Sequence, residues 1–82
     1  MQKLPVVSGA KLIKLMKKLG YEVIRQRGSH VRLRKVTDAG EHNITVPMHP
    51  EMAKGTLNDI LSKLSIWNNI SKEKLIDMLK EV

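Results

Sequence analysis

A β-hairpin is predicted by the segment Arg25-Gln26-Arg27-Gly28-Ser29-His30-Val31-Arg32-Leu33-Arg34. Gly28-Ser29 is a turn signal, because glycine tolerates positive φ and serine hydrogen-bonds the nearby backbone. After the turn, apolar and basic residues alternate, and successive residues of a strand face opposite sides of the sheet. The apolar residues Val31 and Leu33 are therefore expected to face a core. The opposite, solvent face would carry His30, Arg32 and Arg34.

The neighbouring residues extend this hairpin to three strands. The ranges expected to be extended are Tyr21–Arg27, His30–Val36 and Glu41–Val46. A second turn is expected at residues 37–40, and the last strand should stop at Pro47, which cannot donate to a ladder. Short turns between consecutive strands predict an antiparallel meander.

A helix is predicted on the N-terminal side of these strands, at residues Gly9–Leu19. Ser8 is a good N-cap, and Gly20 is typical of the residue that follows a helix end. The apolar residues recur at helical spacing, and they are Leu12, Ile13, Leu15, Met16 and Leu19.

Two helices are predicted on the C-terminal side. Thr56 is expected to cap the first, whose apolar positions are Leu57, Ile60, Leu61 and Leu64. Residues Ser65–Ile70 are expected to interrupt it. Ser71 is then expected to cap a last helix, with Leu75, Ile76, Met78 and Leu79 as its apolar positions.

This order predicts an α+β fold, α-β-β-β-α with an extra C-terminal helix. The three-stranded antiparallel sheet should carry helices on one face and leave the other face open. The double-stranded-RNA-binding architecture has the same order of elements. A chain of 82 residues is expected to form one domain over residues 1–82, with residues 65–82 packing on it as a C-terminal extension.

The composition points to an anionic partner. Fifteen Lys and Arg against eight Asp and Glu give a formal net charge of +7, which favours capture of a polyanion. There is no cysteine, which excludes disulfides and thiolate metal sites and is compatible with a reducing cytoplasm. The N-terminal residues contain no long apolar run, so neither a signal peptide nor a membrane segment is expected. The chain has few aromatic residues, which argues against stacking of bases on an aromatic sheet face.

Cleavage of RNA without a metal is the chemistry that these residues suit. The three histidines have no metal-ligand spacing, so neither a metal nor a cofactor is expected. The 2′-hydroxyl of RNA is an internal nucleophile, and a protein then needs only a proton-transfer group and cations near the phosphate. A histidine exchanges protons near neutral pH, which makes His30 the candidate catalytic residue. Gly28 and Ser29 would present it. The candidate RNA contacts are Arg25, Arg27, Ser29, Arg32, Arg34 and Lys54.

Three segments of the chain resemble the HicA family of mRNA-interferase toxins from toxin–antitoxin pairs. The first is Ser8-Gly9 followed by residues Leu12–Tyr21, which is similar to the family's opening helix. The second is Arg25–His30, a strand, a turn and a histidine. The third comprises Thr45-Val46-Pro47 with His49, then residues Lys54–Leu57 and Ile60-Leu61. Together they cover about Val6 to Leu64.

The resemblance implies a double-stranded-RNA-binding-like fold and an endoribonuclease that cleaves mRNA. It implies that His30 matches the family's catalytic histidine. It also implies a cognate HicB-type antitoxin that blocks the active site. Residues 65–82 are longer than the family pattern and fit it poorly around Trp67.

Two other functions are consistent with the sequence. A non-catalytic module for double-stranded RNA would bind with a steep salt dependence and would not need His30. A protein-interaction domain would use its basic face to bind an acidic partner, and its binding to RNA would be weak.

Overall fold

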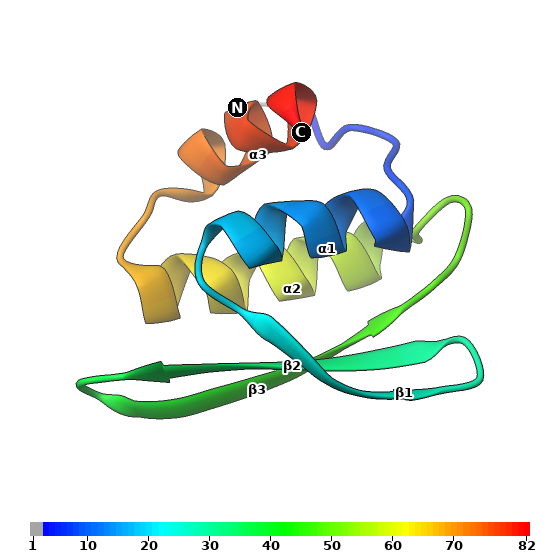
Figure 1. Cartoon of the computed structure of the whole chain (residues 1–82). Helices are drawn as coiled ribbons and strands as arrows, with labels where there is room; N and C mark the ends of the chain where they lie inside the picture. The colour runs from blue at the N-terminus through cyan, green and yellow to red at the C-terminus, as the bar shows by residue number, and fades with distance from the viewer. Residues whose placement is uncertain (1–2) are drawn as a thin grey trace.

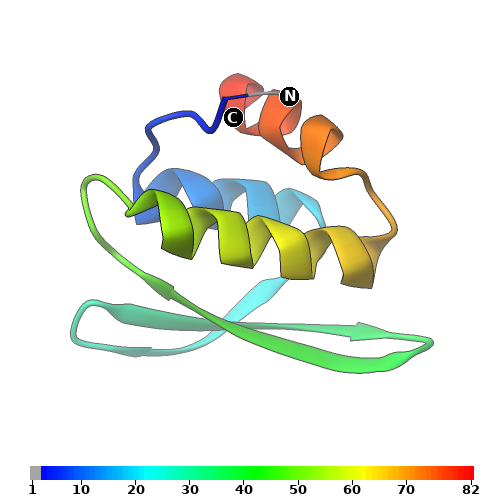
Figure 2. The same cartoon turned by 180° about the vertical axis from the view of Figure 1, so that it is seen from behind.

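A computed structural model describes residues 3–82 of the chain as three stacked layers (Figure 1). The elements in chain order are α1 (Gly9–Lys18), β1 (Glu22–Arg27), β2 (His30–Thr37), β3 (Gly40–Pro47), α2 (Lys54–Asn68) and α3 (Lys72–Glu81). The sheet forms one outer layer, α1 and α2 lie side by side on one of its faces, and α3 lies on top of them (Figures 1 and 2). The predicted α+β fold with an open three-stranded sheet is confirmed.

The helix α1 forms where the capping signals predicted it. The Ser8 side chain accepts a hydrogen bond from the backbone N–H of Lys11 at 3.1 Å, which satisfies a donor of the first turn. The chain leaves the helix through Gly20, whose φ of +100° belongs to the region that glycine tolerates best. The observed end is one residue before the predicted one.

The sheet is an antiparallel meander with the order β1-β2-β3. Burial alternates along β2 and β3 as predicted, and Val31, Leu33, Ile44 and Val46 are buried beneath the helices. On β1 it does not alternate, because all six residues of this edge strand are exposed. The pairing of β1 with β2 shifts between Val23 and Arg25, so Ile24 is an extra residue on β1. Such a bulge bends a strand and increases its twist locally.

The predicted limits of the second helix were wrong at both ends. The helix α2 begins at Lys54, two residues before Thr56, and its N-cap Ala53 provides no side-chain cap. It continues through Ser65–Asn68, which were expected to interrupt it, and ends there because Asn69 has a φ of +52°. Residues 65–68 therefore form its last turn, and side-chain contacts with the sheet hold them there.

The helix α3 packs its apolar side chains on the face of α1 and α2 that is turned away from the sheet (Figure 1). Ser71 caps it as predicted, accepting from the Lys74 N–H at 3.1 Å. Leu75, Ile76 and Leu79 are buried and join the same hydrophobic cluster as the residues of α1, α2 and the sheet. Burial of such side chains contributes about 1.5–3 kcal/mol each.

The segment between β3 and α2 is fixed by the N-terminal segment. The backbone N–H of Gly9 donates to the carbonyl of His49 at 2.9 Å, and the N–H of Met52 donates to the carbonyl of Val7 at 2.9 Å. The approach is so close that a Cβ on Gly9 would lie 2.2 Å from the Pro47 carbonyl oxygen. Glycine is therefore required there for space, and the start of α1 sets the position of the chain after β3.

Candidate functional site

His30 is the first residue of β2 and follows the turn at Gly28-Ser29. Gly28 has a φ of +59°, and a Cβ there would contact nothing within 4 Å. The requirement for glycine at this position is therefore conformational rather than steric. The Ser29 carbonyl accepts a hydrogen bond from the N–H of Met48 at 2.6 Å, so the turn is attached to the chain just after β3. His30 is thus exposed at the end of a fixed hairpin.

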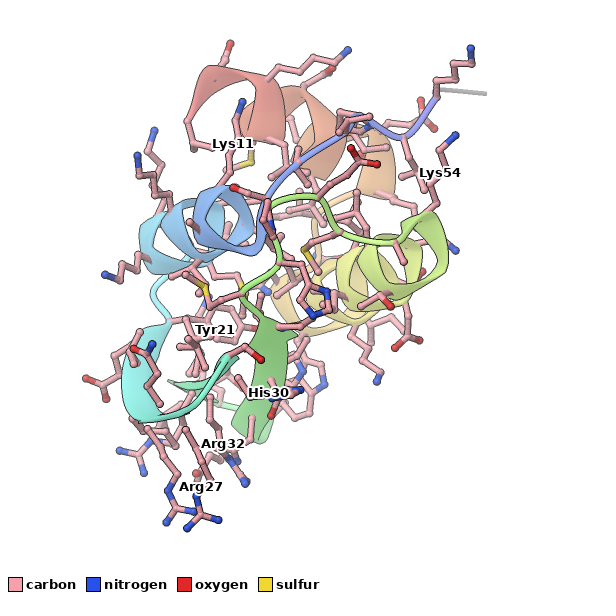
Figure 3. The ribbon with its side chains drawn as sticks, turned by 90° about the vertical axis from the view of Figure 1, so that its right-hand side faces the viewer. Lys11, Tyr21, Arg27, His30, Arg32 and Lys54 are labelled. Carbon is pink, nitrogen blue, oxygen red and sulfur yellow. The ribbon has the colours of Figure 1, made fainter. Side chains whose placement is uncertain are left out.

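Three arginines share the open face of the sheet with His30. Arg27 lies directly opposite His30 in the pairing of β1 with β2, and Arg25 lies opposite Arg32. Directly opposed residues face the same side, and so do residues two apart on one strand. All four side chains are exposed, and Figure 3 shows Arg27 and Arg32 pointing away from the helices. Like charges placed opposite each other are destabilising unless an anion lies between them.

Arg34 lies on the same face but is engaged with carboxylates. Its guanidinium lies 3.7 Å from Glu22 Oε1 on one side and 3.7 Å from Glu41 Oε1 on the other. It is half-buried, and its Nε has no hydrogen-bond partner among the described residues. Arg34 therefore carries less free positive charge than Arg25, Arg27 and Arg32.

Lys54 is not brought together with the arginines. It is the first residue of α2, and its exposed side chain extends from the helical layer, well apart from Arg27 and Arg32 (Figure 3). Of the predicted site residues, the structure therefore gathers His30 and the arginines of β1 and β2 on one face, with Ser29 in the adjoining turn.

A depression of about 240 Å³ lies on the same open face. All three strands contribute to it: Ile24 and Arg25 from β1, Arg32 from β2, and Glu41 and Asn43 from β3. The side chains of Glu41 and Asn43 are connected, because Asn43 Nδ2 donates to Glu41 Oε1 at 3.2 Å. No sequence pattern indicates this depression, since it depends on the bulge and on the register of three strands.

His42 is buried, with 6% of its surface exposed, and it lies far from His30 along the sheet. It pairs with Lys35 on β2 and stacks on Trp67 of α2, with ring centroids 4.7 Å apart and planes at 4°. The sequence reasoning considered it only as a metal ligand. Its alternation with Ile44 and Val46 is the signal that could have identified it as a core residue.

A chain of hydrogen bonds links Lys35 to His42. Lys35 Nζ can only donate, so Asn68 Oδ1 accepts from it at 2.5 Å. Asn68 Nδ2 donates to the Tyr21 hydroxyl at 3.2 Å, and that hydroxyl shares a hydrogen bond with His42 Nδ1.

Burial lowers the pKa of His42, with a further contribution from the positive charge of Lys63. It also raises the pKa of the Tyr21 hydroxyl, an effect that the hydrogen bond from Asn68 partly offsets. These hydrogen bonds join the sheet to the last turn of α2, which explains why that turn is helical.

Other classes of site are not found in the described part of the chain. Within residues 3–82, no three His, Cys, Asp or Glu side chains gather where they could hold a metal ion. No helix over the same residues is long and apolar enough to cross a membrane.

Comparison with known proteins identifies the family of the chain. A family model described as the HicA toxin of bacterial toxin–antitoxin systems matches residues 9–66, from the start of α1 almost to the end of α2. Neither the curated proteins nor the solved structures contain a significant match. The matched residues include the hairpin, His30 and the basic face, and they make up more than half of the chain. The chain therefore belongs to the HicA toxin family.

Proposed function

We propose that this toxin is an endoribonuclease that cleaves mRNA by acid–base chemistry at His30, without a metal ion. The observation that supports this most directly is the position of His30. It is exposed at the end of a fixed hairpin, opposite Arg27 and two residues from Arg32 on the same face. A proton-transfer group and a source of positive charge therefore lie side by side.

The proposed reaction is an internal transfer at phosphorus. His30 assists removal of the proton from the 2′-hydroxyl, and the 2′-oxygen attacks the adjacent phosphorus. The bond to the 5′-oxygen breaks, and that oxygen leaves as a hydroxyl after taking up a proton. The products are a 2′,3′-cyclic phosphate and a 5′-hydroxyl end. Arg27 and Arg32 stabilise the charge that accumulates on the phosphate oxygens.

The same face supports a proposal for RNA binding and inhibition. The residues that would contact the RNA backbone are Arg25, Arg27, Ser29 and Arg32. Arg34 would contribute less because it is paired with two glutamates, and Lys54 would contribute less because it lies apart from the other cations. We further propose that a HicB-type antitoxin inhibits the toxin by covering this face. A net charge of +7 favours an acidic partner surface.

Cleavage of a single-stranded RNA in the presence of a chelator tests the catalytic proposal. We expect the unmodified chain to leave cyclic phosphate ends, and we expect His30→Ala to lose about 10²–10⁴-fold in rate, the usual contribution of one acid–base group. Asp38→Ala, in the turn between β2 and β3, serves as the control and should cleave normally.

The binding of the same RNA separates this proposal from the alternatives. We expect His30→Ala to bind RNA as tightly as the unmodified chain. A folded His30→Ala chain that still cleaves at the normal rate would refute the role of His30. Binding without cleavage by either chain would instead identify a non-catalytic RNA-binding module.

A further inference from the structure

The depression on the open face has the size and lining of a site for one planar base. Its volume of about 240 Å³ is below the range of about 300–1,000 Å³ that is usual for drug-sized ligands. It forms where the extra residue Ile24 lies next to the arginine pair Arg25 and Arg32. The open face therefore carries a shallow, shaped site in addition to its positive charge.

The lining does not suit a phosphate alone. Arg25 and Arg32 attract an anion, but Glu41 in the same depression repels one, and Ile24 is apolar and 41% exposed. Arginine planes and apolar side chains are surfaces on which unstacked bases pack, whereas carboxylates and carboxamides hydrogen-bond base edges. The set of side chains matches a nucleobase whose own phosphate is held by the arginines.

The carboxylate of Glu41 is already positioned. Asn43 Nδ2 donates to its Oε1 at 3.2 Å, and the Arg34 guanidinium lies 3.7 Å from the same oxygen. Both contacts are made by Oε1, and no described residue makes a hydrogen bond to Oε2. The carboxylate is thus held in place with acceptor capacity to spare, as recognition of a donor pair requires.

Guanine is the base that fits this acceptor. Its Watson–Crick edge presents two adjacent donors, N1–H and the N2 amino group, which one carboxylate can accept together. Its O6 and N7 are acceptors for arginine. Adenine and cytosine each place one amino donor beside an acceptor, and uracil has a single donor between two acceptors.

The depression extends along the strands away from His30. Arg32 lies two residues after His30 on β2, about 7 Å away at about 3.3 Å per residue. Glu41 lies opposite Val36, six residues after His30, which places it about 20 Å from His30 along the sheet. A base in the depression would therefore belong to a nucleotide a few positions along the RNA from the phosphate at His30. We propose that Glu41, with Asn43, Arg25 and Arg32, binds a guanine there and gives this toxin a sequence preference at a distance from the scissile phosphate. This inference rests on the proposed ribonuclease function, because it names a base that the toxin would read in the RNA that it cleaves.

Binding to a non-cleaving chain tests the inference apart from catalysis. The protein is the full chain with His30→Ala, and the readout is fluorescence anisotropy at fixed salt. The probes are a short labelled RNA of adenosines, the same RNA with one central guanosine, and the same RNA with inosine at that position. Inosine lacks only the N2 amino group of guanosine.

We expect the guanosine RNA to bind about tenfold more tightly than the adenosine RNA, within the range of one bidentate contact. The inosine RNA should fall between them. Adding Glu41→Gln should reduce the preference to less than about twofold. Glu22→Gln is the matched control, because it removes the same charge and a contact of the same length, 3.7 Å, with Arg34, yet Glu22 lies outside the depression.

Equal binding of the three RNAs would overturn the inference, whether or not the chain with His30 cleaves RNA. Loss of the preference in Glu22→Gln as well as in Glu41→Gln would also overturn it, because the effect would then arise from Arg34. A preserved guanine preference in a chain that never cleaves RNA would support the binding site and refute the proposed catalytic function.

Discussion

Replacing Gly9 by alanine should damage both the stability of the fold and the support of the His30 turn. The new Cβ would lie 2.2 Å from the Pro47 carbonyl oxygen and 3.0 Å from the Met48 Cα, where real Cβ atoms keep at least about 3 Å from any heavy atom. The start of α1 and the chain after β3 must therefore separate by about 1 Å. Both are backbone, so no side-chain rotation relieves the clash.

The magnitude follows from three contributions. Overpacking of this kind costs about 1–3 kcal/mol. Weakening the hydrogen bond from the Gly9 N–H to the His49 carbonyl, now 2.9 Å long, costs about 0.5–1.5 kcal/mol. Alanine recovers about 0.5–1 kcal/mol of helix propensity. We therefore expect Gly9→Ala to lose about 2 kcal/mol of unfolding free energy, and the melting temperature to fall by about 8–16 °C.

Urea denaturation followed by circular dichroism measures this change. Gly55→Ala is the matched control, because Gly55 is also near the start of a helix but has nothing within 4 Å of its Cβ position. It should be neutral or stabilised by about 0.5 kcal/mol. Equal stability of the two variants would refute the reasoning. Because Met48 also holds the Ser29 carbonyl, we expect RNA cleavage by Gly9→Ala to fall even where the protein remains folded.

Three further predictions concern pH, backbone conformation and charge. Because the pKa of His42 is lowered on folding, the unfolded chain binds a proton below about pH 6.5 that the folded chain does not bind. The unfolding free energy should therefore be highest above this pH and should fall below it, by at most about 1.4 kcal/mol per pH unit. Urea titrations of His42→Gln should show a weaker pH dependence. Gly28→Ala should lose about 1–2 kcal/mol in the same assay, because its φ of +59° is unfavourable for alanine although space is free. Arg27→Gln should reduce the slope of log K against log salt for RNA binding by about 1, whereas Lys80→Gln in α3 should leave it unchanged, and equal slopes would exclude a phosphate contact by Arg27.

The elements that could be predicted from the sequence are those with local signals. Ser8 and Gly20 mark the limits of α1, and the alternation after the Gly28-Ser29 turn correctly separated buried from exposed residues on β2. The end of α2 could not be predicted, because Asn68 is held by Tyr21 and Lys35, which are 47 and 33 residues away in the sequence. Without these distant partners, the pair Asn68-Asn69 is typical of a helix break.

The candidate site could also be predicted only where its signals are local. Alternation alone placed His30, Arg32 and Arg34 on one face, and the register of β1 with β2 adds Arg25 and Arg27 to it. The engagement of Arg34 by two glutamates and the depression at Ile24 depend on strand pairing and on a bulge, neither of which has a sequence signal here. The catalytic role of His30 remains a prediction.

The stacking of Trp67 on His42 also provides an intrinsic probe. Trp67 is the only tryptophan of the chain, so all indole fluorescence comes from the contact between α2 and the covered face of the sheet. RNA would bind on the opposite face, away from this ring. An emission change on titration with RNA would therefore report a rearrangement of the layers, whereas a constant emission with changing anisotropy would report simple docking. Loosening of this contact can thus be followed separately from ligand binding, without adding a label.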